Sequence, residues 1–244
     1  MFAQDALLAH NARQIVEETQ RRSRSQTQHY EGTLELHTPE SQPKTQVSTK
    51  RWTFDRMGSS GESKSLLRFM APPELKGVAL LILGHPDGST DQWMWTPAVD
   101  RERRIAQQDR STRFFGTDFS FEDLQERDPN QFEYKLLGTD TVDGAACWKI
   151  DARPKLAKSS QYTRSTLWVR KDNYVTAQIE NFSGDKLIRK IRYSDIVKRD
   201  KILTACEIEV LDPARNSRTV LKIDRLQYNL PMKAEDFTVE ALRR

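Results

Sequence analysis

The residues with reactive side chains lie apart in the sequence and form none of the short motifs that mark a catalytic centre. The histidines and cysteines are His10, His29, His37, His85, Cys147 and Cys206. Neither the H-x-x-x-H nor the C-x-x-C spacing of a metal site occurs. A serine nucleophile on a sharp turn needs G-x-S-x-G, whereas residues 58–61 read Gly-Ser-Ser-Gly, which is one residue too short. We therefore expect no bound metal and no catalytic serine.

Acidic side chains cluster once, at Asp118, Glu122 and Asp123. Paired carboxylates can act as a general acid and a general base. However, Arg113 is close in sequence, and Ser120 can cap a short helix from residue 121 with Asp123 at its third position. Ion pairing and capping explain the cluster better than acid–base catalysis. With no glycine-rich phosphate loop either, we predict a protein that is not an enzyme and has no cofactor. An enzyme is the least favoured of three alternatives.

Large aromatic side chains are numerous for a chain in which only 36% of the residues are hydrophobic. Four phenylalanines fall within residues 114–121, and burial of each is worth roughly 1.5–3 kcal/mol. We interpret residues 72–77 and 114–124 as two lids over an apolar cavity, the usual form of a lipid or small-molecule site. The candidate ligand-binding residues are Trp52, Phe54, Phe69, Trp93, Trp95, Phe114, Phe115, Phe119, Phe121, Leu124 and Trp168. For any single ring, ordinary core packing is the favoured interpretation.

The segments that must position these side chains read as one helix followed by a long sheet. Residues 1–24 are expected to hold an N-terminal helix, since apolar residues recur near helical spacing without Gly or Pro. From residue 28 to residue 230 the hydrophobic period is two, with turn residues between the segments, which is typical of hairpins. We predict a mainly β fold, an antiparallel sheet capped by short helices, in a single domain over residues 1–244.

Charge is nearly balanced, with 39 Lys and Arg against 35 Asp and Glu. The basic residues are interleaved with acidic ones, so we expect no nucleic-acid partner. Residues 101–113 and residues 186–201 contain an excess of basic side chains. We interpret these side chains as the solvent-exposed faces of strands. The alternative is an interaction module that docks on an acidic surface or partner through Arg189, Arg192 and Lys198.

Membrane insertion and disulfide bonding are both disfavoured by the sequence. No run of about 18 apolar residues is present, so no transmembrane helix is expected. The first residues lack the basic start and apolar core of a signal peptide. In its strand Cys147 shares a face with Lys149 and Asp151, whereas Cys206 lies on the apolar face of another strand. We therefore predict two free thiols.

Four sequence blocks resemble the LolA-like branch of the outer-membrane lipoprotein-sorting family, and their order and spacing match as well. They are residues 69–77 (FMAPPELKG), residues 91–98 (DQWMWTPA), residues 103–105 (RRI) and residues 115–124 (FGTDFSFEDL). The resemblance extends over nearly the whole chain after Tyr30. The well-studied carriers have an arginine just before a proline in an early strand, and residues 49–54 (TKRWTF) lack that proline.

The resemblance implies a single curved antiparallel sheet, an unclosed half β-barrel with an N-terminal helix and short lid helices. It also implies a periplasmic carrier, its signal peptide removed, that binds a lipid or the acyl chain of a lipoprotein without catalysis. An inner-membrane transporter is a further expected partner, and we expect a monomer. The alternative is a non-carrier interaction module, for example an accessory protein of an envelope transporter.

Overall fold

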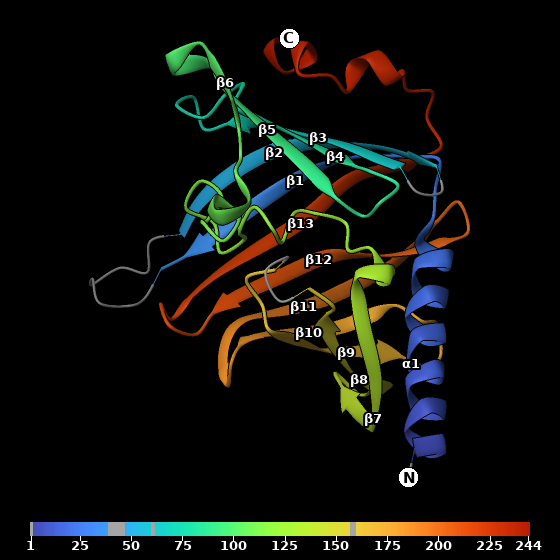
Figure 1. The fold of residues 1–244 in the computed structure, drawn as a ribbon. Coiled ribbons are helices and arrows are strands. Elements are labelled where there is room, and N and C mark those ends of the chain that lie inside the picture. The colour runs from blue at the N-terminus through green and yellow to red at the C-terminus, as the bar shows by residue number, and fades with distance from the viewer. Residues whose placement is uncertain (1, 39–46, 60–61, 157–159) are drawn as a thin grey trace. The chain divides into compact units, whose positions relative to one another are not determined.

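The computed structural model describes residues 2–38, 47–59, 62–156 and 160–244, without the side chains of residues 2–10 and Ser59. One α-helix, α1 (Phe2–Ser23), precedes the strands (Figure 1). The strands are β1 (Thr27–His37), β2 (Val47–Ser59), β3 (Glu62–Ala71), β4 (Ala79–Gly84), β5 (Thr90–Thr96), β6 (Arg101–Arg104), β7 (Phe132–Val142), β8 (Ala145–Pro154), β9 (Arg164–Arg170), β10 (Thr176–Ser183), β11 (Lys186–Arg199), β12 (Ile202–Asp212) and β13 (Ser217–Tyr228).

The strands are hydrogen-bonded in one sheet in the order β6-β5-β4-β3-β2-β1-β13-β12-β11-β10-β9-β8-β7. Strands β6 and β7 are its two edges, so the sheet is not closed. Except for β1 and β13, neighbours along the sheet are consecutive in the chain, and pairs such as β1 with β2 and β7 with β8 are antiparallel. The mainly β, antiparallel fold with an N-terminal helix is therefore confirmed.

The two expected lid helices are hydrogen-bonded turns instead. In residues 72–77 the amide of Leu75 donates to the carbonyl of Pro72, and the amide of Gly77 donates back to Phe69 in β3. Only seven residues separate β3 from β4, too few for a helix to propagate. In the second segment Ser120 and Asp123 cap one another as predicted, at 2.8 Å and 3.3 Å, but a single turn follows.

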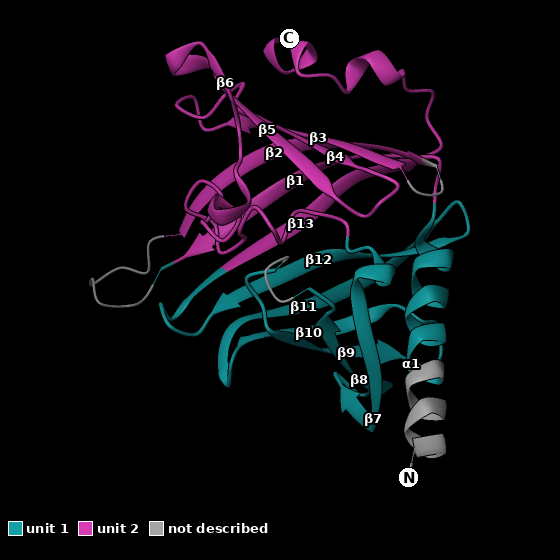
Figure 2. Cartoon of the chain, viewed as in Figure 1, with its two compact units in different colours: residues 1–24, 38–42, 127–218 teal, residues 25–37, 43–126, 219–244 magenta. Residues whose placement is uncertain are grey.

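The chain divides into two compact units (Figure 2). Unit 1 comprises residues 1–24, 38–42 and 127–218, and unit 2 comprises residues 25–37, 43–126 and 219–244. In unit 1, α1 lies along β7 and its neighbours and buries its apolar face on them. The buried residues of that core are Ala12, Ile15, Val16, Tyr134, Ile150, Ala152, Leu167 and Val169.

In unit 2, the period-two pattern of β1 buries Tyr30, Leu34 and Leu36 as the sequence predicts. Gly32 lies opposite Trp52 of β2, and a Cβ atom there would come within 2.3 Å of the indole nitrogen. The missing side chain at this position therefore makes room for the Trp52 ring. A second cluster in this unit joins Trp95 of β5 to Phe237 and Leu242 near the C-terminus.

Candidate functional site

Six of the sequence-predicted aromatic residues meet in one cluster of unit 2. The ring of Phe114 stacks on Phe69 at 5.4 Å between centroids and meets Phe115 and Phe121 edge-on at 5.0 Å and 5.3 Å. Trp52 lies 6.3 Å from Phe114 and 6.4 Å from Phe119. Because these rings contact one another and all except Phe115 are buried, the cluster is filled by its own side chains.

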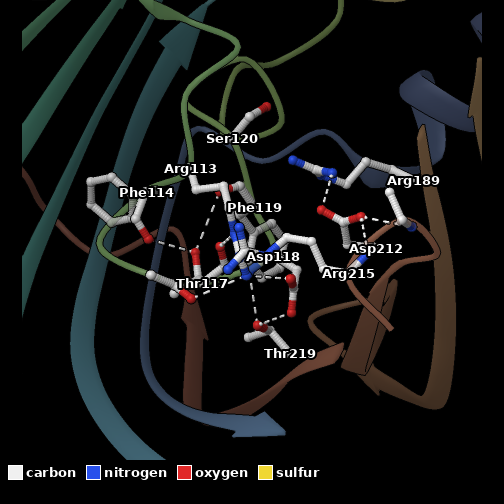
Figure 3. A network of polar contacts seen from close by, with 12 residues as sticks. Arg113, Phe114, Thr117, Asp118, Phe119, Ser120, Arg189, Asp212, Arg215 and Thr219 are labelled. Atoms are coloured by element: carbon white, nitrogen blue, oxygen red, sulfur yellow. Dashed lines mark hydrogen bonds and ion pairs between the residues drawn. The ribbon is translucent and has the colours of Figure 1, made fainter. Parts of the chain in front are cut away.

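Polar contacts tie residues 110–124 to the strands beneath them. The carboxylate of Asp118 accepts from Arg113 of the same segment and from the hydroxyl of Thr219 in β13 (Figure 3). Lys50 of β2 donates to the carbonyl of Phe115, and Gln92 of β5 donates to the carbonyl of Phe121 at 2.8 Å. Asp118 is 1% exposed, so these hydrogen bonds offset the cost of burying its carboxylate. The segment is a strap that is hydrogen-bonded along its length.

The remaining predicted residues lie outside this ring cluster. Phe54 stacks on Tyr30 at 4.9 Å, and Trp93 and Trp95 both pack with the C-terminal cluster of unit 2. Leu124 is half-buried at the end of the strap. Trp168 belongs to unit 1, where it packs with Val142, Cys147 and Ala177 and donates to Asp140 at 3.0 Å.

An apolar pocket of about 140 Å³ lies in unit 1, between α1 and strands β7, β8, β9 and β10. Its lining residues are Val16, Thr19, Gln20, Arg127, Phe132, Tyr134, Ala152, Leu167, Val169, Thr176 and Ile179. None of the sequence-predicted site residues is among them. The helix supplies one wall and the period-two face of the strands supplies the other, so both walls follow from patterns visible in the sequence, whereas the unfilled volume between them does not.

Polar groups border this pocket at the turn before β7. The amide of Gln20 donates to the carbonyl of Arg127 at 2.7 Å, which joins α1 to that turn. The guanidinium of Arg127 donates to Ser165 at 3.2 Å and to Asn181 at 2.9 Å. Burial raises the pKa of Tyr134 to about 12, so its phenol is neutral at ordinary pH. The pocket thus combines apolar walls, one cation and neutral polar groups, which suits binding better than catalysis.

Three of the basic residues of β11 pair with carboxylates. Arg189 is buried and donates to Asp212 at 3.0 Å, Lys190 lies 3.3 Å from Glu180, and Arg192 pairs with Asp143. The docking role considered for Arg189 is therefore wrong, because its guanidinium does not face solvent. Its charged end is held by a buried carboxylate of β12 (Figure 3).

Both cysteines are free thiols, as predicted, and both are buried. Cys147 packs with Val142, Trp168 and Ala177 on the face that it shares with Lys149, whose ammonium lies over the Trp168 ring. Burial raises the pKa of the Cys147 thiol, which disfavours a reactive thiolate. In the part of the chain that the structure describes, no three His, Cys, Asp or Glu side chains are grouped to hold a metal ion. No described helix is long and apolar enough to cross a membrane.

Comparisons with known proteins agree with the resemblance seen in the sequence. A family model described as “Uncharacterized protein” matches residues 61–244. No curated protein sequence matches the chain. A structure from Vibrio parahaemolyticus, described as an outer membrane lipoprotein-sorting protein domain, has a TM-score of 0.90 and 22% identity, covering 97% of this chain and 100% of that one.

Two further structures share the fold. A DUF1329 family protein from Desulfovibrio piger has a TM-score of 0.90 and 26% identity, covering 96% of this chain and 99% of that one. A LolA superfamily protein from Nitrosomonas europaea has a TM-score of 0.75 and 18% identity, covering 94% of this chain and 98% of that one. The chain therefore has the fold of the LolA-like, lipoprotein-sorting group.

Proposed function

Because the chain belongs to the family described as “Uncharacterized protein” and has a LolA-like fold, we propose that it is a periplasmic binding protein for the acyl chain of a lipid or lipoprotein. It binds this chain without catalysis. The observation that carries the proposal is the apolar pocket beneath α1 in unit 1. The name of the Vibrio neighbour, a lipoprotein-sorting domain, supports the same class of cargo.

The free energy for binding comes from apolar surface removed from water, about 0.8 kcal/mol for each buried CH₂ group. A pocket of about 140 Å³ has the size of an engineered cavity of about 150 Å³ that binds benzene. In the conformation that the structure shows, the pocket therefore has room for only a short part of an acyl chain. A longer acyl chain requires α1 to move away from β7, and we propose α1 as the movable cover.

The aromatic cluster of unit 2 is a second proposed location for the acyl chain, beneath residues 72–77 and 114–124. It would use the candidate residues that the sequence singles out. Binding there requires the rings of Phe69, Phe114 and Phe115 to separate, because they now contact one another. The pocket of unit 1 requires no such rearrangement for a short chain, so we favour it.

Mass spectrometry of an organic extract of the purified protein, together with binding of the neutral probe N-phenyl-1-naphthylamine, tests the function. We expect co-purifying lipid and a rise in probe fluorescence. Thr176→Trp should fill the pocket and abolish the rise, because Thr176 is a half-buried lining residue. Leu137→Trp on β7 is the matched control, since Leu137 is exposed and lies outside the lining.

Phe115→Asp separates the two locations. Loss of probe binding in Thr176→Trp but not in Phe115→Asp supports the pocket of unit 1, and the reverse pattern supports the aromatic cluster. A wild-type protein with no extractable lipid and no probe binding would show that the proposed function is wrong.

A further inference from the structure

Arg127 places a positive charge on the wall of the unit 1 pocket, and no carboxylate is among the described lining residues. Its guanidinium donates to the Ser165 hydroxyl and to the Asn181 side-chain oxygen, and both partners are neutral. Among the described residues, no ion pair includes Arg127. This sets it apart from Arg189 and Arg113, each of which faces a buried aspartate.

The surroundings hold the Arg127 guanidinium in place. Ser165 donates to Asn181 at 2.7 Å, so the two acceptors of the guanidinium are themselves joined. The Phe132 ring lies 5.5 Å from the guanidinium carbon, and Gln20 of α1 fixes the backbone carbonyl of the same residue. A fixed guanidinium loses little freedom when it binds a ligand, which is the condition for a specific site.

The donors of Arg127 exceed the partners that the protein supplies. A guanidinium has five N–H groups in a planar fork, and the Nε–H of Arg127 donates to no described residue. A charge beside an apolar volume is costly unless it is paired. A carboxylate can accept two parallel N–H bonds from such a fork, in short, charge-assisted hydrogen bonds.

The other charges near the pocket do not supply this pairing. Glu17 of α1 pairs with Arg13 at 2.7 Å, and the Asp128 carboxylate accepts from the backbone of Asn130 at 2.9 Å. No Lys, Asp, Glu or second Arg is among the lining residues. Arg127 is thus the one charged residue of the described lining, and its single positive charge can pair with one negative charge on a ligand.

We propose that the pocket selects a single-chain amphiphile with a free carboxylate, such as a fatty acid, which places its head on Arg127 and its chain against Val16, Leu167 and Val169. This inference rests on the proposed function and specifies its ligand. Of the two cargoes named in the proposed function it selects a lipid with a free carboxylate over a lipoprotein, whose acyl groups are held as esters or amides.

Competition against N-phenyl-1-naphthylamine at neutral pH tests the proposal, with decanoate, methyl decanoate and decanol as competitors. We expect decanoate to bind wild-type protein about tenfold or more tightly than the two neutral compounds, as for a charge-assisted pair. Arg127→Gln should remove this preference, because it should weaken the binding of decanoate about tenfold more than the binding of decanol. Arg153→Gln is the matched control, because it removes one positive charge from an exposed side chain of β8 that pairs with Asp151.

The outcomes separate this inference from the function on which it rests. Equal binding of decanoate and methyl decanoate by wild-type protein would overturn the carboxylate proposal and leave the apolar binding function intact. A decanoate preference that survives in Arg127→Gln would also overturn it. Failure of all three compounds and of the probe to bind wild-type protein would overturn both. Retained probe binding by Arg127→Gln confirms that this variant is folded.

Discussion

The backbone amide of Asp118 donates to the hydroxyl oxygen of Thr219 at 2.9 Å, and this hydroxyl donates back to the Asp118 carboxylate at 2.8 Å. One short side chain of β13 thus satisfies two groups of the strap 101 residues away in sequence. Both residues are buried, so water cannot replace the bonds without opening unit 2. The pair fixes the strap over the aromatic cluster.

Thr219→Val should destabilise the protein. Valine has nearly the same shape but neither accepts from the amide nor donates to the carboxylate, and an unsatisfied buried group costs about 1–3 kcal/mol. Urea denaturation should show this loss in the free energy of unfolding. Thr33→Val on β1, where no hydrogen bond of the threonine side chain is found in the structure, is the control and should change stability little. Equal stability of the two variants would contradict the role of Thr219.

Phe114→Ala should lower the free energy of unfolding by about 3–5 kcal/mol, as for large-to-small changes of buried aromatic residues. Phe114 is 0% exposed and contacts Trp52, Phe69, Phe115 and Phe121. Leu137→Ala removes an apolar side chain that is 51% exposed and should cost less than about 0.5 kcal/mol. A small effect of Phe114→Ala would mean that the strap rings are loosely packed.

Arg189→Met should destabilise unit 1 by about 3–5 kcal/mol, because it leaves the buried charge of Asp212 without its cation. Adding Asp212→Asn removes that charge while keeping an oxygen that can accept from the amides of Ala214 and Arg215. The double variant should therefore be more stable than the sum of the single changes predicts. Additive losses in chemical denaturation would argue against a direct pair.

Stability should fall as the pH rises from about 10 to 12, in part because of Tyr134. Its pKa is raised to about 12 by burial, so between these values the unfolded chain loses this proton while the folded protein keeps it. Stabilisation by the neutral phenol is complete below pH 10 and is lost as the pH rises toward 12. Tyr134→Phe should make the free energy of unfolding less dependent on pH in this range. An unchanged pH dependence would contradict a buried phenol.

Local patterns in the sequence were sufficient for α1 and for strands such as β1, but not for the two lids, which are turns rather than helices. Alternation over β1 placed Tyr30, Leu34 and Leu36 in the core, and the spacing of Ile15 and Val16 placed one face of α1. The mutual capping of Ser120 and Asp123 was also predictable, because the two residues are three apart. In each case the deciding contacts depend on a period of the backbone or on a few neighbouring residues.

Long-range juxtaposition was needed for the rest. The sequence marked the aromatic residues but not that their rings fill the space between them, since that depends on strand register and side-chain volume. The burial of Arg189 could not be predicted from the sequence, because its partner Asp212 lies on another strand. The strongest example is the pocket of unit 1, where Gln20 and Arg127 meet across 107 residues. Periodicity determined which faces are apolar, whereas only the tertiary structure decided which two faces leave space between them and which cation borders that space.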